Sequence, residues 1–350
     1  MAYTTINKPS DYFNTVNYTG TAGGQTISGV GHQPDFIWVK GKDAGYDHSL
    51  HNSVSGLLKQ LISNSTSAEI TNTDTITSNN ADGFVLGADT AGPNANSNNQ
   101  DTKNYVAWNW KAGTTAIPSG STTDPLGVSI NTTSGFGIYK ITSPASGSYV
   151  LKHGLGKKPK MVIVKDLEAS QKWMVWSDTF SNATNDYIKL NSTDAKATYS
   201  TCWGTMNSTD CTISVGGTLD ANNDHVVYIF TDTTGYCKHG SYIGNGDNNG
   251  TFIYTGFKPA FVMVKRSDGA GDWAIMDTKR NTFNVMNKYL RAQGSDAEGT
   301  DASFDIDAVS NGFKLRYNNG NYNASGGNYI YMCFAEAPLV GTNGVTAKAR

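Results

Sequence analysis

Two aspartates at repeated positions are the first candidates for chemistry in this chain. Trp173 and Trp273 each lie 14 residues after a proline, and Asp178 and Asp277 follow them at nearly the same interval. Glycoside hydrolysis uses a pair of carboxylates in this way, one as the acid and one as the base or nucleophile. Because the two aspartates belong to different copies of a repeat, we expect them to lie far apart. The pattern therefore favours a turn-capping role for each of them.

Residues 220–225 are the second candidate, because their aspartate and asparagine side chains offer oxygen ligands suited to Ca²⁺. Asp and Asn at this density are also standard turn residues, and we interpret the segment as a turn. Zinc would need histidines at ligand spacing, and His48 with His51 is the one such pair. We expect surface positions for all six histidines, which are His32, His48, His51, His153, His225 and His239. The sequence thus predicts neither a metal site nor a cofactor.

Enzyme motifs are missing from the chain. It has no Gly-x-Ser-x-Gly elbow, no His-Glu-x-x-His zinc motif, no phosphate-binding loop and no Cys-x-x-Cys pair. The glycine-rich segment 244–250 lies between expected strands with no helical pattern after it, so we interpret it as a hairpin tip. We expect no catalytic residue, and we do not expect an enzyme.

Aromatic side chains set among Asn and Gly are the candidates for ligand binding. An exposed aromatic ring can pack against a sugar ring, and its polar tip can form a hydrogen bond. A tyrosine beside a strand end is also often part of the packing, so both interpretations stay open. The candidates are Trp203, Tyr242, Tyr317 and Tyr322.

The element that must position these residues is a motif that occurs three times. A proline is followed six residues later by a lysine, with an apolar run between them, at Pro34, Pro159 and Pro259. Proline fixes φ and lacks a donor, which suits the first residue of a strand, and the short apolar run predicts a buried strand. The spacings of 125 and 100 residues predict three units, each large enough to bury its own core.

The composition predicts an all-β chain. Charged residues make up only 16%, aromatic residues 11%, and Asn-Gly pairs suited to tight turns recur between short apolar runs. The formal charge is −2, from 27 basic and 29 acidic residues with no basic run, so we expect no nucleic-acid partner. No apolar stretch is long enough to span a membrane, and the first residues lack the apolar segment of a signal peptide. Four cysteines are too few for a disulfide framework, although Cys202 and Cys211 could bridge a hairpin.

We therefore predict three tandem antiparallel β-sandwiches of the jelly-roll or lectin-like kind, each of about 100 residues. A single closed superstructure, such as three blades around an axis, is the alternative. Short amphipathic helices are expected at 53–64 and 281–292, and a surface loop, mobile or ligand-binding, at 90–103. The predicted boundaries are 11–113 for the first unit, 114–133 for a linker, 134–234 for the second unit, 235–338 for the third and 339–350 for a C-terminal tail.

The first unit also carries several stretches with a specific resemblance. They include Phe-Asn-Thr-Val-Asn-Tyr-Thr-Gly at 13–20, the proline-led strand within 27–40, Asp-Gly-Phe-Val-Leu-Gly at 82–87 and Tyr-Val-Ala-Trp-Asn-Trp-Lys-Ala-Gly at 105–113. Together they resemble an uncharacterised β-rich domain family found in structural proteins of marine tailed bacteriophages, including cyanophages. The later units keep the proline-led strand, the tryptophan and the closing strand, whereas His48 takes the place of the tryptophan in the first unit. The resemblance implies a component of the virion surface and no catalytic residue.

We therefore expect a structural protein on the surface of a tailed-phage virion, either a tail or fibre component or a head decoration, assembled in the host cytoplasm. The expected partners are other virion proteins, further copies of the same chain in a homo-oligomer, and host-surface glycans. A carbohydrate-binding adhesin and a glycan-degrading enzyme are the two alternatives.

Overall fold

The computed structural model describes residues 3–92, 94–113, 115–341, 344 and 346–348. Within these residues the chain is all-β, built from antiparallel strands in several sheets. Two 3₁₀-helices, η1 (Pro9–Asp11) and η2 (Ala302–Phe304), interrupt the strands, and the described residues contain no α-helix. The scarcity of strong helix formers and the many turn residues account for this outcome.

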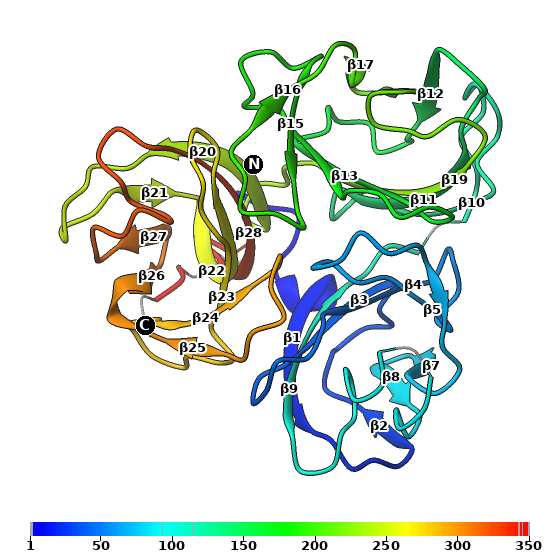
Figure 1. Ribbon diagram of the computed structural model, residues 1–350. Coiled ribbons are helices and arrows are strands. Elements are labelled where there is room, and N and C mark those ends of the chain that lie inside the picture. The colour runs from blue at the N-terminus through cyan, green and yellow to red at the C-terminus, as the bar shows by residue number, and fades with distance from the viewer. Residues whose placement is uncertain (1–2, 93, 114, 342–343, 345, 349–350) are drawn as a thin grey trace.

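Each third of the chain forms a main sheet and a smaller three-stranded sheet, and we call these thirds units 1, 2 and 3 (Figure 1). In unit 1 the main sheet has the order β1 (Phe13–Thr19), β9 (Asn104–Trp110), β3 (Phe36–Gly41), β4 (Ser49–Asn52). The smaller sheet has the order β2 (Gln25–Ile27), β8 (Gly83–Leu86), β7 (Ile76–Asn80), and β5 (Lys59–Gln60) pairs with β6 (Ile70–Thr71).

Units 2 and 3 repeat this plan. The main sheet of unit 2 has the order β10 (Gly127–Asn131), β11 (Phe136–Thr142), β19 (Asp224–Phe230), β13 (Met161–Asp166), β14 (Met174–Ser177), β15 (Asp186–Lys189), β16 (Ala197–Thr198), and its smaller sheet is β12 (Ser148–Lys152), β18 (Asp210–Ser214), β17 (Trp203–Met206). The main sheet of unit 3 has the order β20 (Cys237–Ile243), β28 (Asn328–Pro338), β22 (Phe257–Arg266), β23 (Trp273–Asp277), β24 (Lys288–Arg291), β25 (Gly299–Thr300), and its smaller sheet is β21 (Phe252–Tyr254), β27 (Gly312–Leu315), β26 (Ile306–Val309).

Within each unit, one face of the main sheet packs against the smaller sheet. In unit 1 the buried cluster between the two layers includes Val39 of β3 and Ala107 of β9, with Ile76 of β7 and Phe84 of β8 opposite. Units 2 and 3 have equivalent clusters between their layers. Successive side chains of a strand point to opposite faces, so the other face of each main sheet carries a second apolar set.

That second set forms one core shared by all three units. It includes Trp38, Ile163 and Met263, which each lie four residues after the repeated proline. Figure 1 shows the three units arranged around a common centre. The proline-led strands are therefore covered on both faces, which explains why each is an uninterrupted apolar run. The units close around a shared core, as in the second of the two architectures considered from sequence.

Strand register places equivalent residues at equivalent positions in the three units. Phe36 lies opposite Asn52, Met161 opposite Ser177, and Phe261 opposite Asp277. Each pair is offset from its repeated proline by the same two intervals. The duplication inferred from sequence is thus visible in the hydrogen-bonded pairing.

The residue 14 positions after each proline joins neighbouring units. Trp173 Nε1 donates to the carbonyl of Ile62 at 3.0 Å, and Trp273 Nε1 donates to that of Lys189 at 2.8 Å. In unit 1, His48 Nε2 bonds the carbonyl of Arg291 at 2.8 Å, while its Nδ1 accepts from Trp38 Nε1 at 2.7 Å. The ring of His48 therefore supplies the hydrogen bond to the neighbouring unit that a tryptophan N–H supplies in units 2 and 3. All three contacts between units, which we call seams, are closed by the same interaction.

The lysine that ends each motif is fully buried, and in units 1 and 3 it forms a hydrogen bond across a seam. The Nζ atoms of Lys40 and Lys265 donate to carbonyls of the neighbouring unit, those of Ser295 at 3.0 Å and Thr193 at 3.2 Å. Lys165 Nζ donates to the carbonyl of Asp166 in its own unit at 2.7 Å. Burial lowers the pKa of each of the three ammonium groups to about 8.

The two predicted helices are wrong. Residues 53–64 form turns and the short strand β5, and 281–292 contain turns and β24. Gly56 has a φ of +93°, which an α-helix cannot contain. Leu61 and Leu290 face the shared core from extended backbone. The apolar spacing that predicted a helix therefore reflects contacts with this core.

The range predicted as a linker contains a strand, since β10 pairs along the outer edge of β11. The four cysteines are buried and free, so Cys202 and Cys211 form no bridge. No helix in the described part of the chain has the length and apolar character needed to cross a membrane.

Candidate functional site

The aromatic residues predicted to bind a ligand are mostly part of the packing. Trp203 is buried and donates its indole N–H to the carbonyl of Asp186. Tyr242 is buried and stacks on Tyr329 across the β20–β28 pair, with ring centroids 5.0 Å apart. Tyr322 is also buried. The expectation of exposed rings is therefore wrong for these three residues, because each ring lies on the inner face of a sheet or beneath a loop.

Tyr317 is the exception among these candidates, since 39% of it is exposed. It lies after the end of β27, and its carbonyl accepts a hydrogen bond from Asn323 Nδ2 at 2.9 Å. It does not line the cavity described below. A ligand role for Tyr317 stays a prediction.

The two repeated aspartates are structural and are not true equivalents. The register places Asp277 at the position of Ser177, and Asp178 is the next residue. Asp178 forms ion pairs with Lys158 and Lys160 at the end of β14. The carboxylate of Asp277 is fully buried against Arg280. They lie in separate units, as expected, and each is held by its own cation.

All six histidines are buried, so the expected surface positions are wrong. His51 Nδ1 lies 2.7 Å from the carbonyl of Leu57, and its Nε2 lies 2.8 Å from Ser49 Oγ. Burial lowers the pKa of His48 to about 3 and that of His51 to about 4. Both side chains are therefore neutral structural groups that use both ring nitrogens in hydrogen bonds.

Residues 220–225 form a turn whose acidic groups point to different partners. Asp220 Oδ2 accepts from Gln171 Nε2 at 2.5 Å, whereas Asp224 pairs with Lys140 at 3.2 Å. Among the residues that the structure describes, no three His, Cys, Asp or Glu side chains gather as metal ligands would.

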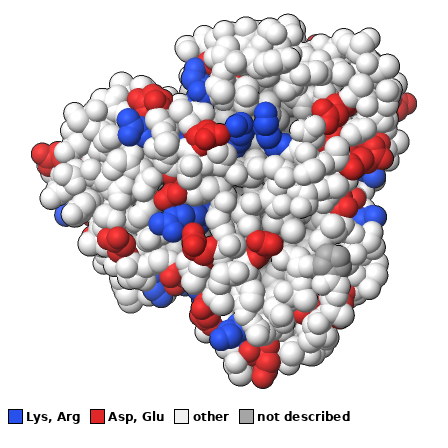
Figure 2. Space-filling model, in the orientation of Figure 1, with Lys and Arg blue, Asp and Glu red and all other residues white. Residues whose placement is uncertain are grey.

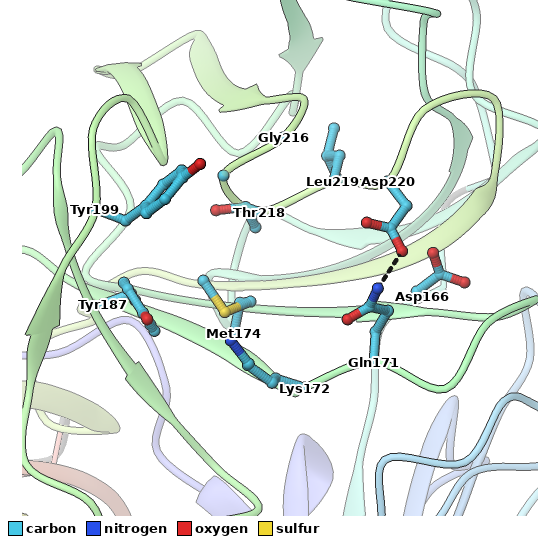
Figure 3. Close-up of a pocket in the computed structure, with 11 residues that line it drawn as sticks. Asp166, Gln171, Lys172, Met174, Tyr187, Tyr199, Gly216, Thr218, Leu219 and Asp220 are labelled. Carbon is cyan, nitrogen blue, oxygen red and sulfur yellow. Dashed lines mark hydrogen bonds between the residues drawn. The ribbon is translucent and has the colours of Figure 1, made fainter.

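The candidate site is a polar cavity of about 280 Å³ in unit 2 (Figure 3). It lies between the end of the main sheet and the loop that precedes the closing strand β19. Residues from four stretches of the unit line it: Asp166, Gln171, Lys172, Met174, Tyr187, Tyr199, Gly216, Gly217, Thr218, Leu219 and Asp220. At about 30 Å³ per water molecule, the cavity has room for about nine waters, or one sugar ring.

The two ends of the cavity differ in chemistry. Tyr187 and Tyr199 lie at one end, and the bonded pair of Gln171 and Asp220 lies at the other (Figure 3). Met174 lines the space between them. Tyr199 is 52% exposed, so the cavity reaches the surface at the aromatic end. Aromatic rings opposite a planar carboxylate–amide pair can hold a ligand that has one apolar face and several hydroxyls.

The polar end is held rigidly by the residues behind it. Asp166 accepts backbone N–H bonds from Glu168 at 2.8 Å and Ala169 at 2.7 Å, and a third bond from Asn223 Nδ2 at 2.9 Å. Although burial opposes it, hydrogen bonding from these donors holds the pKa of this carboxyl well below its ordinary value. The Asp220 N–H in turn lies 3.2 Å from His225 Nε2. The backbone that carries the ligand-facing carboxylate is thus fixed before any ligand arrives.

Sequence reasoning considered Asp220 as a Ca²⁺ ligand or a turn residue and missed both tyrosines of the cavity. Tyr187 lies in β15 and Tyr199 just after β16, in stretches that carry no motif. A cavity forms where residues from other parts of the chain are too small to fill the space. No pattern within a single stretch of sequence can indicate this.

The loop at 90–103, considered as a binding loop, is instead packed into unit 1. Ser97, Asn98 and Asn99 are fully buried, and Asp89 accepts the backbone N–H groups of Asn98 and Asn99. Pro93 lies outside the described residues.

Charges on the molecular surface are mixed. On the face shown in Figure 2, acidic and basic side chains are interspersed among a majority of uncharged residues. This face therefore carries no broad field of one sign that would attract a highly charged partner.

Comparison with known proteins gives one match, which is to a protein family. No curated protein and no solved structure matches the chain. The family model covers residues 8–338 and so spans the main and smaller sheets of all three units. The chain belongs to the family described as Domain of unknown function (DUF7483).

Proposed function

We propose that this protein is a surface component of a tailed-phage particle that binds a saccharide through the cavity in unit 2. In this proposal the three units are tandem sandwiches of the jelly-roll or lectin-like kind, and the chain acts as a binding module without turnover. Saccharide targets would be host-surface glycans. Other virion proteins and further copies of this chain would hold it on the particle.

The observation that carries the proposal is the arrangement of the cavity, with Tyr187 and Tyr199 at one end and the Gln171–Asp220 pair at the other. Sugars present an apolar face of C–H groups and an edge of hydroxyls, which suits an aromatic surface beside a planar acceptor and donor pair. The size of the cavity also fits a single ring rather than an extended polymer.

The virion assignment is supported by the stretches of unit 1 that resemble a phage structural family, including 13–20 and 105–113. Large exposed apolar side chains give unit 3 a surface for contacts with other subunits. Ile243 at the end of β20, with Phe252 and Tyr254 of β21, is between 44% and 62% exposed. Light scattering of the purified protein tests the homo-oligomer, and imaging of intact particles labelled at the C-terminus tests the virion location.

A glycan array tests the binding function. We expect the wild-type protein to bind a limited set of glycans, and Tyr199→Ala to lose that binding, because Tyr199 is exposed at the mouth of the cavity. Phe283→Ala is the matched control, since it removes an exposed aromatic ring of unit 3 that does not line the cavity. Absence of binding by the wild-type protein, or equal loss in both variants, would refute the proposal.

A further inference from the structure

One structurally equivalent position is surrounded differently in each of the three units. Strand pairing places Ile188 opposite Val175 in unit 2 and Leu290 opposite Ile275 in unit 3. The residues just before them, Tyr187 and Tyr289, are therefore equivalent. In unit 1 the bridge between Leu50 and Leu61 gives Gln60 the same place.

In unit 3 an aromatic ring fills the space over this position. Phe304 stacks on Tyr289 with ring centroids 3.8 Å apart and an interplanar angle of 18°. Tyr322 lies next to Phe304, with its centroid at 5.7 Å, and Phe304 and Tyr322 are both buried. The equivalent tyrosine thus already holds a six-membered ring against its face.

In unit 1 a hydrogen-bonded cluster fills the same space. Gln60 Nε2 donates to Ser49 Oγ at 2.6 Å and lies 3.3 Å from Ser97 Oγ. Asn98 Nδ2 donates to Ser49 Oγ at 3.1 Å. These side chains are fully buried, so polar groups of the chain itself occupy this place.

In unit 2 the chain segment and the side chain that would fill this space are both smaller. The segment between β16 and β17 has four residues, 199–202, whereas the segment between β25 and β26 has five, 301–305, and includes Phe304. Six residues before the start of the closing strand, unit 2 has Thr218 where unit 1 has Asn98 and unit 3 has Tyr322. These two differences leave the cavity of about 280 Å³ beside Tyr187.

We propose that the ligand of this cavity is a neutral pyranose ring that packs its apolar face on Tyr187, in the place that Phe304 takes on Tyr289. The inference rests on the proposed saccharide-binding function and names the class of sugar and the surface that it contacts. Adjacent hydroxyls of the ring bond the Asp220 carboxylate and the Gln171 amide at the other end of the cavity. The cavity is lined by two carboxylates, Asp166 and Asp220, and one ammonium group, Lys172. A sugar acid would therefore meet an excess of negative charge, and its carboxylate would bring no hydrogen to donate to the Asp220 end.

The test is saturation-transfer NMR on the full-length protein. The probes are the methyl glycosides of glucose, galactose, mannose and N-acetylglucosamine, with N-acetylneuraminic acid as the anionic probe. We expect transfer to at least one neutral glycoside, strongest at the protons of one ring face, and none to the anionic sugar. Tyr187→Ala is expected to weaken binding about tenfold, because a ring contact over the sugar face is lost.

The decisive variant is Thr218→Tyr, which introduces into unit 2 the side chain that unit 3 carries at this position. It is expected to abolish binding while the circular dichroism spectrum and the unfolding temperature stay close to those of the wild type. Phe283→Ala, the matched control in unit 3, is expected to bind normally, because this exposed aromatic ring does not line the cavity. Phe304→Leu is a second control, because it disturbs the equivalent stack in unit 3 without touching the cavity.

The outcomes separate this inference from the function on which it rests. Saccharide binding that persists in Thr218→Tyr, or that is restricted to the anionic sugar, overturns the neutral pyranose on Tyr187 and leaves glycan binding in place. Absence of binding to every probe and to a glycan array overturns both. If Thr218→Tyr fails to fold, loss of binding by folded Tyr187→Ala with normal binding by Phe283→Ala supports the inference, and normal binding by both refutes it.

Discussion

The buried ion pair of Asp277 and Arg280 gives a prediction whose size follows from its geometry. Asp277 Oδ1 accepts the backbone N–H groups of Lys279 at 3.0 Å and Arg280 at 2.8 Å. Oδ2 accepts from Arg280 Nε at 2.5 Å and from Trp108 Nε1 of unit 1 at 3.1 Å. Both side chains are 0% exposed, and the pair lies at the seam between units 3 and 1. Asp277→Asn keeps the shape of the side chain and removes its charge.

An asparagine can accept at one oxygen only, so either the backbone donors or the side-chain donors would face an NH₂ group. The guanidinium would also stay buried, with Glu298 at 3.2 Å as its remaining carboxylate. Breaking a buried pair by removing one charge costs about 3–5 kcal/mol. We therefore expect Asp277→Asn to lower the free energy of unfolding by about that amount.

Urea denaturation followed by tryptophan fluorescence measures this change, and Asp178→Asn is the matched control. Asp178 pairs with Lys158 and Lys160, whose side chains are 49% and 33% exposed. Exposed pairs of this kind contribute about 0–1 kcal/mol, so we expect a small effect from the control. Equal losses in the two variants would refute the reasoning, since burial would then not determine the cost.

Three further predictions concern the seams and the shared core. Because burial lowers the pKa of His48 to about 3 and that of His51 to about 4, while an unfolded histidine titrates near 6.5, the unfolded chain binds more protons across this window. The free energy of unfolding should therefore fall as the pH drops from about 6.5 towards 4, and a flat profile in urea titrations at pH 7, 5.5 and 4.5 would contradict this. Trp273→Phe should cost about 1–3 kcal/mol in the same assay, because it leaves the partly buried carbonyl of Lys189 without its donor at 2.8 Å, and a loss below about 0.5 kcal/mol would count against the seam bond. Since one core joins the three units, calorimetry should show a single unfolding transition, and two or three resolved transitions would show that the units unfold independently.

The sequence pattern was sufficient to predict the repeated strands. Buried strands begin two residues after Pro34 and Pro159, whereas Pro259 is the third residue of β22. His48 occupies the position of Trp173 and Trp273, as the intervals implied. These features were visible because a proline, an apolar run and a fixed interval are local properties. The predicted helices at 53–64 and 281–292 were wrong because contacts with distant parts of the chain decided the structure there. The apolar residues at helical spacing lie in short strands and turns that pack against the core.

The candidate site was likewise predictable from sequence only in part. Asp220 could be named as a turn residue, but nothing within one unit indicated that Tyr187 would border an open space or that Tyr242 would be buried against Tyr329. Burial of a ring depends on the strand opposite it, and that strand is 87 residues further along the chain in the case of Tyr242 and Tyr329.

By itself, the sequence determined the all-β class and the threefold repetition, because strand periodicity, proline and turn residues act over a few neighbours. Only the tertiary structure decided that the units close around one core, that the repeated lysines are buried, that His48 bonds across a seam, and that a cavity stays open in unit 2. Those outcomes depend on which side chains from separate units fill the same volume, and close packing is a property of the assembled fold rather than of any stretch of the chain.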